Sequence, residues 1–402
     1  MKPTAANIAA GALLALHATS LFTIPPLAVN VVVTATAIVF LGCRKSLSLL
    51  STAKAKAAKG ASSQPETLTL SASEAWQMPI YGSLALCGMY ALIKLLGKKL
   101  LNYILLTYFV GLGLVAVEQL LESEASRIFK KAARSKARRG RVVTLWKVVA
   151  SLAEQATVDL RLNTLQQLCW ACSAILMVFY ATTKHWLLNN LIGVALCVSG
   201  IESISIGSMR TAALLLALLF VYDITWVFAS DVMVTVAKGI DGPVKLLFRR
   251  SFDDREKNFS MLGLGDIVVP GLFLALLLRF DVAQKRRGRP FFRFTLLAYA
   301  LGLILTLYVM FTFDAAQPAL LYLVPACLGA SALVGVCRGE FAQLAAYTEE
   351  DKAPPPPGTN GAAAPKRAAS PRRGSKSPKR AASPKRAGAT TPRRRSARIT
   401  SQ

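Results

Sequence analysis

Long runs of apolar residues constrain this chain more than any other feature of its sequence. A helix needs about 20 apolar residues to cross a hydrocarbon core about 30 Å thick, and we find nine windows near that length. Apolar residues make up 53% of the chain and charged residues only 17%, a balance foreign to water-soluble proteins. The sequence therefore predicts an all-α integral membrane protein with nine transmembrane helices. The windows cover approximately residues 27–43, 78–96, 101–121, 167–184, 187–206, 211–236, 261–280, 292–313 and 317–337.

Both ends of the chain differ from this membrane region. Residues 1–26 hold an apolar segment cut off by two prolines, which is either signal-like or part of the first span. From residue 348 the composition changes to Ala, Pro, Ser, Lys and Arg, which predicts a disordered tail over 348–402. Between the ends, we expect N-terminal membrane helices (spans 1–5) in 27–210 and a membrane core of spans 6–9 in 211–347.

Basic residues predict the orientation of the spans. The chain has 48 Lys and Arg against 21 Asp and Glu, and residues 352–402 hold 14 of the basic residues and none of the acidic ones. Cytoplasmic loops carry an excess of Lys and Arg. Placing the amino terminus in the lumen puts the basic loops near residues 54–59, 127–141 and 285–289 in the cytosol, together with the tail.

Histidine and cysteine usage excludes some classes of enzyme. The two histidines, His17 and His185, cannot build a His-rich zinc site, and the chain has no H-E-x-x-H motif, which excludes a zinc protease. The seven cysteines lie in or beside apolar runs, where cysteine behaves as a small hydrophobic residue. For Cys169 and Cys172 we favour packing over redox chemistry. We predict neither a metal nor a cofactor.

Asp223 and Asp266 are acidic residues well inside predicted spans, whereas Asp231 lies nearer the lumen and Glu202 near a span end, where an interfacial position is favoured. Such groups are costly in a membrane and are functional candidates, although a satisfied hydrogen bond inside the bundle is the alternative. Each aspartate lies thirteen residues from an arginine, Arg210 or Arg279, that marks the cytosolic end of its span. At 1.5 Å per residue, both carboxyl groups would lie about 20 Å from that end. Neighbouring antiparallel helices would then bring them together.

A carboxyl pair at that depth can perform acid–base chemistry. Two like charges in a medium of low dielectric cannot both ionise, so the pair holds one shared proton. The ionised carboxylate can take a proton from water while its protonated partner donates to a peptide carbonyl. Peptide hydrolysis by this route needs neither a metal nor a covalent intermediate.

Irregular backbone surrounds the predicted pair. Gly263 and Gly265 precede Asp266, and glycine permits a close backbone approach, although an ordinary first helical turn is the alternative. A second irregular segment opens the last span, and its unwound, strand-like backbone could pair with an extended peptide. Its alternative is proline at the first turn of a helix. This segment consists of Gln317, Pro318, Ala319 and Leu320.

These residues resemble the three motifs of the presenilin and signal peptide peptidase family of intramembrane aspartyl proteases. The matching motifs are Tyr222-Asp223, Gly263-Leu264-Gly265-Asp266 and Gln317-Pro318-Ala319-Leu320. The resemblance implies that Asp223 and Asp266 are catalytic, that Tyr222, Gly263 and Gly265 shape the site, and that Gln317 to Leu320 bind substrate. It also implies nine spans, an endoplasmic-reticulum membrane and membrane-embedded substrates, including signal-peptide remnants and type II segments. Residues 211–347 are then the catalytic core.

Within the family, the connector between the two aspartate spans favours the signal peptide peptidase branch. Presenilins carry a long hydrophilic loop there, whereas this connector is short, Ala237 to Ser260. The chain ends Ile399-Thr400-Ser401-Gln402 without a dilysine retrieval signal, which leaves retention unexplained. The sequon at Asn258 abuts a span, so its glycosylation stays open.

Four Ser/Thr-Pro-basic-basic repeats occupy the tail, beginning at Ser370, Ser377, Ser383 and Thr391. Contact with anionic lipids is the first explanation, phosphorylation by proline-directed kinases the second, and nucleic-acid binding is disfavoured. As a whole, the chain has two rival interpretations from other classes: a proton-coupled transporter or channel, and a non-catalytic scaffold in membrane-protein degradation at the endoplasmic reticulum. A homo-oligomer or a degradation complex is an expected assembly.

Overall fold

The computed structural model describes residues 5–23, 25–57, 68–128, 164–229, 232–250, 259–313 and 317–349. All of them belong to one compact unit, Met1–Ala353. Several predictions fall outside these residues: the tail beyond residue 349, the sequon at Asn258 and most of the basic loop after residue 128. Thr348 and Glu349, which the domain prediction assigns to the tail, are part of the folded unit.

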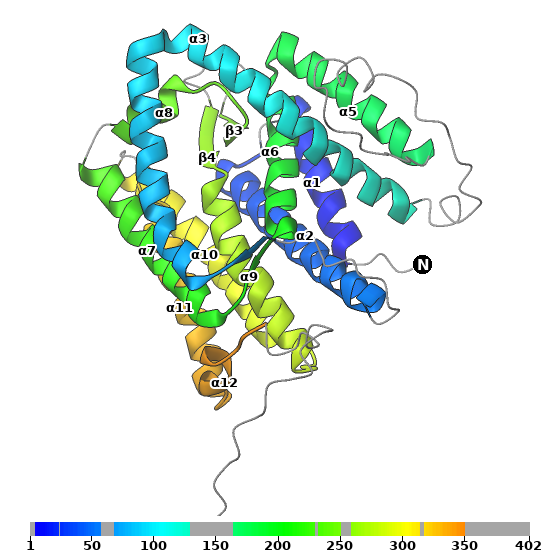
Figure 1. The fold of residues 1–402 in the computed structure, drawn as a ribbon, viewed down its shortest axis with the longest axis vertical. Helices are drawn as coiled ribbons and strands as arrows, with labels where there is room; N and C mark the ends of the chain where they lie inside the picture. The colour runs from blue at the N-terminus through cyan, green and yellow to red at the C-terminus, as the bar shows by residue number, and fades with distance from the viewer. Residues whose placement is uncertain are drawn as a thin grey trace, which may run out of the picture. The chain divides into compact units, whose positions relative to one another are not determined.

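Helices make up most of the described chain, and two small two-stranded sheets lie between them (Figure 1). The parallel pair joins β1 to β2, and the antiparallel pair joins β3 to β4. In chain order the elements are α1 Ala5–Phe22, α2 Leu27–Ala57, β1 Leu68–Leu70, α3 Ala72–Ile128, α5 Thr164–Thr183, α6 Trp186–Ser203, β2 Ile204–Ile206, α7 Met209–Ala229, α8 Val232–Gly239, β3 Lys245–Arg249, β4 Phe259–Gly263, α9 Gly265–Ala283, α10 Pro290–Phe313, α11 Leu320–Cys337 and α12 Phe341–Ala345.

The multi-pass helical membrane class is confirmed, whereas the number of nine spans stays a prediction. Seven helices in the described ranges are long and apolar enough to cross a membrane. One of them, α3, covers both predicted windows 78–96 and 101–121. It changes direction at Gly97, whose φ of 75° is a conformation that glycine adopts without strain. The helix α9 covers most of window 261–280 but carries three charged residues, and it is not among the seven.

Bends and boundaries depart from the predicted windows in two further places. The helix α2 continues to Ala57, past the end of the predicted window 27–43 and into the predicted basic loop near residues 54–59. Residues 261–263 of the window 261–280 are not helical, because they form the end of β4. The apolar amino-terminal segment forms a helix of its own, α1, which packs against α2.

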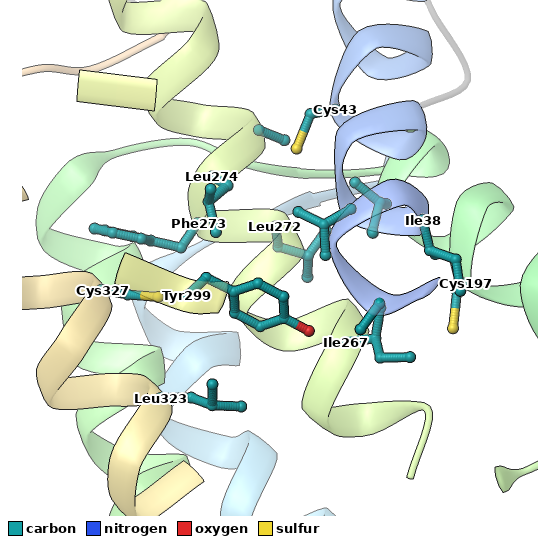
Figure 2. Packing of buried hydrophobic residues seen from close by; sticks show 14 of the residues in the cluster. Ile38, Cys43, Cys197, Ile267, Leu272, Phe273, Leu274, Tyr299, Leu323 and Cys327 are labelled. Atoms are coloured by element: carbon teal, nitrogen blue, oxygen red, sulfur yellow. The ribbon is translucent and has the colours of Figure 1, made fainter. Parts of the chain in front are cut away.

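The helix α9 lies at the centre of the core. Its residues from Leu272 to Leu278 are buried on every side, as expected of a helix that is apolar all round. It contacts α2, α6, α7, α10 and α11. Gly271 allows the closest approach, because a Cβ atom there would lie 2.5 Å from Ile201 Cδ1 of α6. Figure 2 shows the side chains of the surrounding helices packed around α9: Ile38, Cys43, Cys197, Tyr299, Leu323 and Cys327.

The hairpin of β3 and β4 is the main element that the sequence did not predict. Its strand β3 lies within the connector from Ala237 to Ser260, and β4 begins at the end of that connector and continues to Gly263. Leu246 and Phe248 of β3 point into the core, where both are almost fully buried. Because α9 begins directly after β4, the position of the hairpin determines where Asp266 lies.

Candidate active site

Asp223 lies in the middle of α7 and is 6% exposed. Its Oδ2 atom accepts a hydrogen bond of 3.0 Å from the backbone N–H of Leu320, the first residue of α11. The first N–H groups of a helix have no partner within the helix, and Ala319 at the N-cap offers no side-chain acceptor. The carboxylate of Asp223 therefore caps α11 from another helix, which fixes the orientation of that carboxylate.

Asp266 lies at the second position of α9 and is half-buried. A Cβ atom on Gly263 would lie 3.3 Å from Asp266 Oδ2, so the absence of a side chain there leaves room for the carboxylate. Gly265 has open space around its own Cβ position, and the structure gives no steric reason for glycine there. Of the two predicted glycines, Gly263 is thus the one in contact with the carboxyl group.

Tyr299 of α10 holds the backbone of Asp266 in place. Its hydroxyl donates a hydrogen bond of 3.3 Å to the carbonyl oxygen of Asp266. That carbonyl has no helical partner because residue 270, four positions later, is a proline without an N–H. The sequence interpretation missed Tyr299, but Pro270 was a signal that the carbonyl needs a donor from elsewhere.

The two helices that carry the aspartates, α7 and α9, contact each other. The helix ends that carry Arg210 and Arg279 lie at the same level, because one segment contacts both. The Tyr347 carbonyl accepts from the N–H of Met209 at the start of α7, and Glu349 Oε1 lies 2.7 Å from Arg279 Nε near the end of α9. The equal depth of the two carboxyl groups, which the thirteen-residue spacing predicts, stays a prediction.

The segment from Gln317 to Leu320 lies beside Asp223, but it is not a strand. Gln317 and Pro318 have no regular structure, and the helix α11 begins at Leu320. The expectation of strand-like backbone at this segment is therefore wrong, because the N–H of Leu320 is already bonded to Asp223. In the part of the chain that the structure describes, the strand next to the aspartates is β4.

Tyr222 faces α3, and the structure does not bring it toward Asp266. Successive residues of a helix point about 100° apart, so Tyr222 and Asp223 face different neighbours. The ring of Tyr222 lies 3.3 Å from the Cβ position of Gly82 in α3. One turn further, Trp226 Nε1 donates 3.1 Å to the Ser83 hydroxyl of the same helix.

The described segments contain no group of three or more His, Cys, Asp or Glu side chains that could hold a metal ion. The site that they do build consists of two carboxyl groups, a helix amino terminus and an adjacent strand. Asp223 is held through its carboxyl group by α11, and Asp266 is held through its backbone carbonyl by α10.

Known proteins match most of this chain. The family model of signal peptide peptidase matches residues 62–351. The signal peptide peptidases of Homo sapiens and Mus musculus are each 37% identical over 300 residues, which cover 74% of this chain and 78% of theirs. Intramembrane protease 2 of Caenorhabditis elegans is 47% identical over 195 residues, 44% of this chain and 41% of that protein.

With a multi-pass helical fold, these matches show that the protein is an intramembrane aspartic protease. They do not favour a transporter or channel. More narrowly, the chain belongs to the signal peptide peptidase family. Its substrates are accordingly transmembrane segments in a lipid bilayer.

Proposed function

We propose that Asp223 and Asp266 are the catalytic pair and that they hydrolyse peptide bonds within transmembrane helices, such as signal-peptide remnants and type II segments. The observation that carries this proposal is the capping of α11 by Asp223, which orients one carboxylate on a helix that contacts the helix of Asp266. One oxygen of Asp223 is engaged by Leu320, and the other remains for a water molecule.

The two carboxyl groups have different tasks. A hydrogen bond from a helix amino terminus stabilises the ionised form of a carboxyl group, so Asp223 acts as the base. Asp266 then carries the shared proton and acts as the acid. Water attacks the peptide carbonyl carbon, its proton passes to Asp223, and the proton of Asp266 passes to the carbonyl oxygen.

The resulting tetrahedral diol collapses with the reverse exchange of protons. Asp223 donates its proton to the departing nitrogen as the C–N bond breaks, and Asp266 takes a proton from one hydroxyl. The products are a carboxylic acid and an amine, and both side chains return to their initial states. No further reactant is required, because the water supplies all atoms added to the substrate.

A substrate segment must be extended before it is cut, since helical carbonyls are hydrogen-bonded and shielded. The strand β4 offers a template for that extension, because β3 is its only strand partner in the described chain and β4 ends next to the site. Addition of a peptide strand to an exposed sheet edge is a common mode of peptide recognition. The substrate-binding surface is completed beside Asp223 by the residues that precede Leu320, namely Gln317, Pro318 and Ala319.

The remaining assignments concern the surroundings of the enzyme. We place it in the endoplasmic-reticulum membrane with a lumenal amino terminus and a cytosolic tail, on the basis of the loop charges. Anionic lipids and proline-directed kinases are the partners that the tail repeats suit. A homo-oligomer or a degradation complex is the assembly that we would test first.

The test compares wild type with Asp223→Asn and Asp266→Asn, purified in detergent and supplied with a synthetic signal-peptide helix. We expect each substitution to lower the rate of cleavage by about 1,000-fold or more, because each removes one partner of the proton exchange. Asp241→Asn is the matched control, since Asp241 is exposed and bonded to Asn102. Cleavage at the wild-type rate by either variant would refute the catalytic assignment.

A further inference from the structure

Two neighbouring asparagines of α6 bind the backbone of β3. Asn190 Nδ2 donates 2.7 Å to the Leu247 carbonyl, and Asn190 Oδ1 accepts 2.7 Å from the Leu247 N–H. Asn189 Nδ2 donates 2.8 Å to the Lys245 carbonyl. Both asparagines are almost fully buried, at 5% and 1% exposure, so their amides are hydrogen-bonded to the strand instead of to solvent.

These hydrogen bonds cover the outer edge of β3. Along an antiparallel pair, residues directly opposite each other alternate between pairs that bond across the ladder and pairs whose backbone groups point outward. Leu247 uses its N–H and C=O on Asn190, so the pair of Leu247 with Met261 belongs to the outward type. The pair of Lys245 with Gly263 is of the same type.

The same alternation defines the opposite edge of the hairpin. On β4, the backbone groups of Met261 and Gly263 point away from β3, toward the side where the described residues provide no further strand. Gly263 lies three positions before Asp266 and in contact with its carboxylate. One edge of the sheet is thus closed by α6, and the other is open next to Asp266.

The packing of α6 supports this contact. One turn beyond Asn190, a Cβ atom on Gly193 would lie 2.8 Å from Leu246 Cδ2, so glycine lets the helix approach the hairpin closely. At the start of α6, the Trp186 ring lies between the Arg249 guanidinium, at 5.1 Å, and the Phe259 ring, at 6.2 Å. The helix α6 therefore contacts both strands, and its two asparagines bind the outer edge of β3.

We propose that Asn189 and Asn190 are positioning residues that take the place of a third strand, so that an extended substrate adds only to β4 and is presented to Asp266 in one register. The inference rests on the proposed function. Without the asparagines, the β3 edge would expose unpaired N–H and C=O groups that could bind substrate in an unproductive position. The hairpin would also lose the contacts that fix its angle to α9.

The experiment measures KM, kcat per active molecule and the position of the cut, with purified protein and a synthetic signal-peptide helix whose products are weighed by mass spectrometry. Active molecules are counted by titration with a hydroxyl-bearing peptide isostere. For Asn190→Leu we expect KM to rise about tenfold, since two buried hydrogen bonds are lost. We also expect a second product whose end is displaced by two residues, the smallest slip that keeps side chains on the same faces.

Milder variants keep the test informative if Asn190→Leu does not fold. Asn190→Asp retains the acceptor for Leu247 N–H but loses the donor to its carbonyl, and we expect the same changes. Tyr180→Phe removes the hydroxyl that donates 3.3 Å to Asn189 Oδ1, and we expect KM to rise about twofold. Asn30→Leu is the control, because Asn30 is a buried asparagine of α2 whose hydrogen-bond partner is Thr34 of the same helix.

A purely structural role would lower the number of active molecules while leaving KM and the cut position unchanged. That result for Asn190→Leu and Asn190→Asp, together with loss of cleavage in Asp223→Asn, would overturn the inference and leave the proposed function standing. Cleavage by Asp223→Asn at the wild-type rate would instead overturn the proposed function, and this inference with it. A raised KM and a displaced cut in the Asn190 variants, but not in Asn30→Leu, would support the inference.

Discussion

The two helices that carry the aspartates have different surroundings. The helix α9, with Asp266 at its start, is enclosed by other helices, and Leu276 at its middle has no exposed surface. The helix α7, with Asp223, has one side open: the side chains of Val221 and Phe228 are 58% and 61% exposed. In a membrane, that open side contacts lipid.

Because of this difference, the carboxyl group of Asp266 has a fixed position and that of Asp223 a peripheral one. Asp266, itself half-buried, begins the helix that runs through the centre of the core, whereas Asp223 is buried but belongs to a helix that forms part of the outer surface. A substrate helix that arrives through the lipid therefore meets α7 before α9. We expect the packing of α9 to determine stability and the open side of α7 to tolerate change.

The largest expected effect comes from one substitution made in both helices. Leu276→Ala in α9 removes a fully buried side chain, and we expect it to lower the free energy of unfolding by about 3 kcal/mol. Leu214→Ala in α7, where the side chain is 36% exposed, should cost below about 1 kcal/mol. Unfolding by a graded mixture of detergent and dodecyl sulfate provides the measurement. Equal losses in the two variants would remove the distinction between the helices.

A smaller loss of stability is expected at the polar segment after α12, which joins the start of α7 to the end of α9. Glu349 forms an ion pair with the buried Arg279 and accepts 2.9 Å from the Ser205 hydroxyl, while its N–H donates to the Gly207 carbonyl. Glu349→Gln would leave Arg279 buried without its opposite charge. We expect a loss of about 2 kcal/mol, less than for a fully enclosed pair because Glu349 is partly exposed.

The same unfolding titration measures this loss, and Glu340→Gln is a suitable comparison, since Glu340 pairs with the exposed Arg338 as well as with Arg286. If Glu349→Gln were as stable as wild type, the segment after α12 would not hold the two helices together.

The smallest effect concerns alkaline pH. Burial, followed by the charge of Glu349, raises the pKa of Tyr347 to about 12, and its ring packs edge-on against Phe280 of α9. The unfolded chain loses this proton at a lower pH than the folded one, so Tyr347 stabilises the fold below pH 10 and loses that contribution as the pH rises toward 12. The decline in unfolding midpoint between pH 9 and pH 11 should therefore be shallower in Tyr347→Phe. Parallel curves would contradict the assignment.

The sequence was sufficient for the membrane class, because apolar length is a signal that tertiary context seldom overrides. That the two acids lie at one depth stays a prediction from their spacing. The sequence also placed Gln317 to Leu320 near the aspartates, although only through a resemblance. It did not reveal that Leu320 N–H binds Asp223, since a backbone donor has no residue signature.

The hairpin escaped prediction for a different reason. Residues 245–249 and 259–263 are short segments with three apolar residues each, and such runs do not distinguish a strand from the end of a span. Asn189 and Asn190 were visible as two amides inside a predicted span, yet their partner was a strand that had not been predicted. A polar residue that has no assigned role in a predicted span therefore indicates a neighbouring segment whose backbone is not helical.

The most direct test of the central claim is an experimental structure with a hydroxyl-bearing peptide isostere bound, in which the hydroxyl stands for the attacking water. The account predicts that one oxygen of Asp223 and one of Asp266 both lie within about 3 Å of that hydroxyl. It also predicts that the peptide is extended along β4 at Met261 and Gly263. A hydroxyl contacted by only one of the two carboxyl groups, with the other turned away, would contradict it.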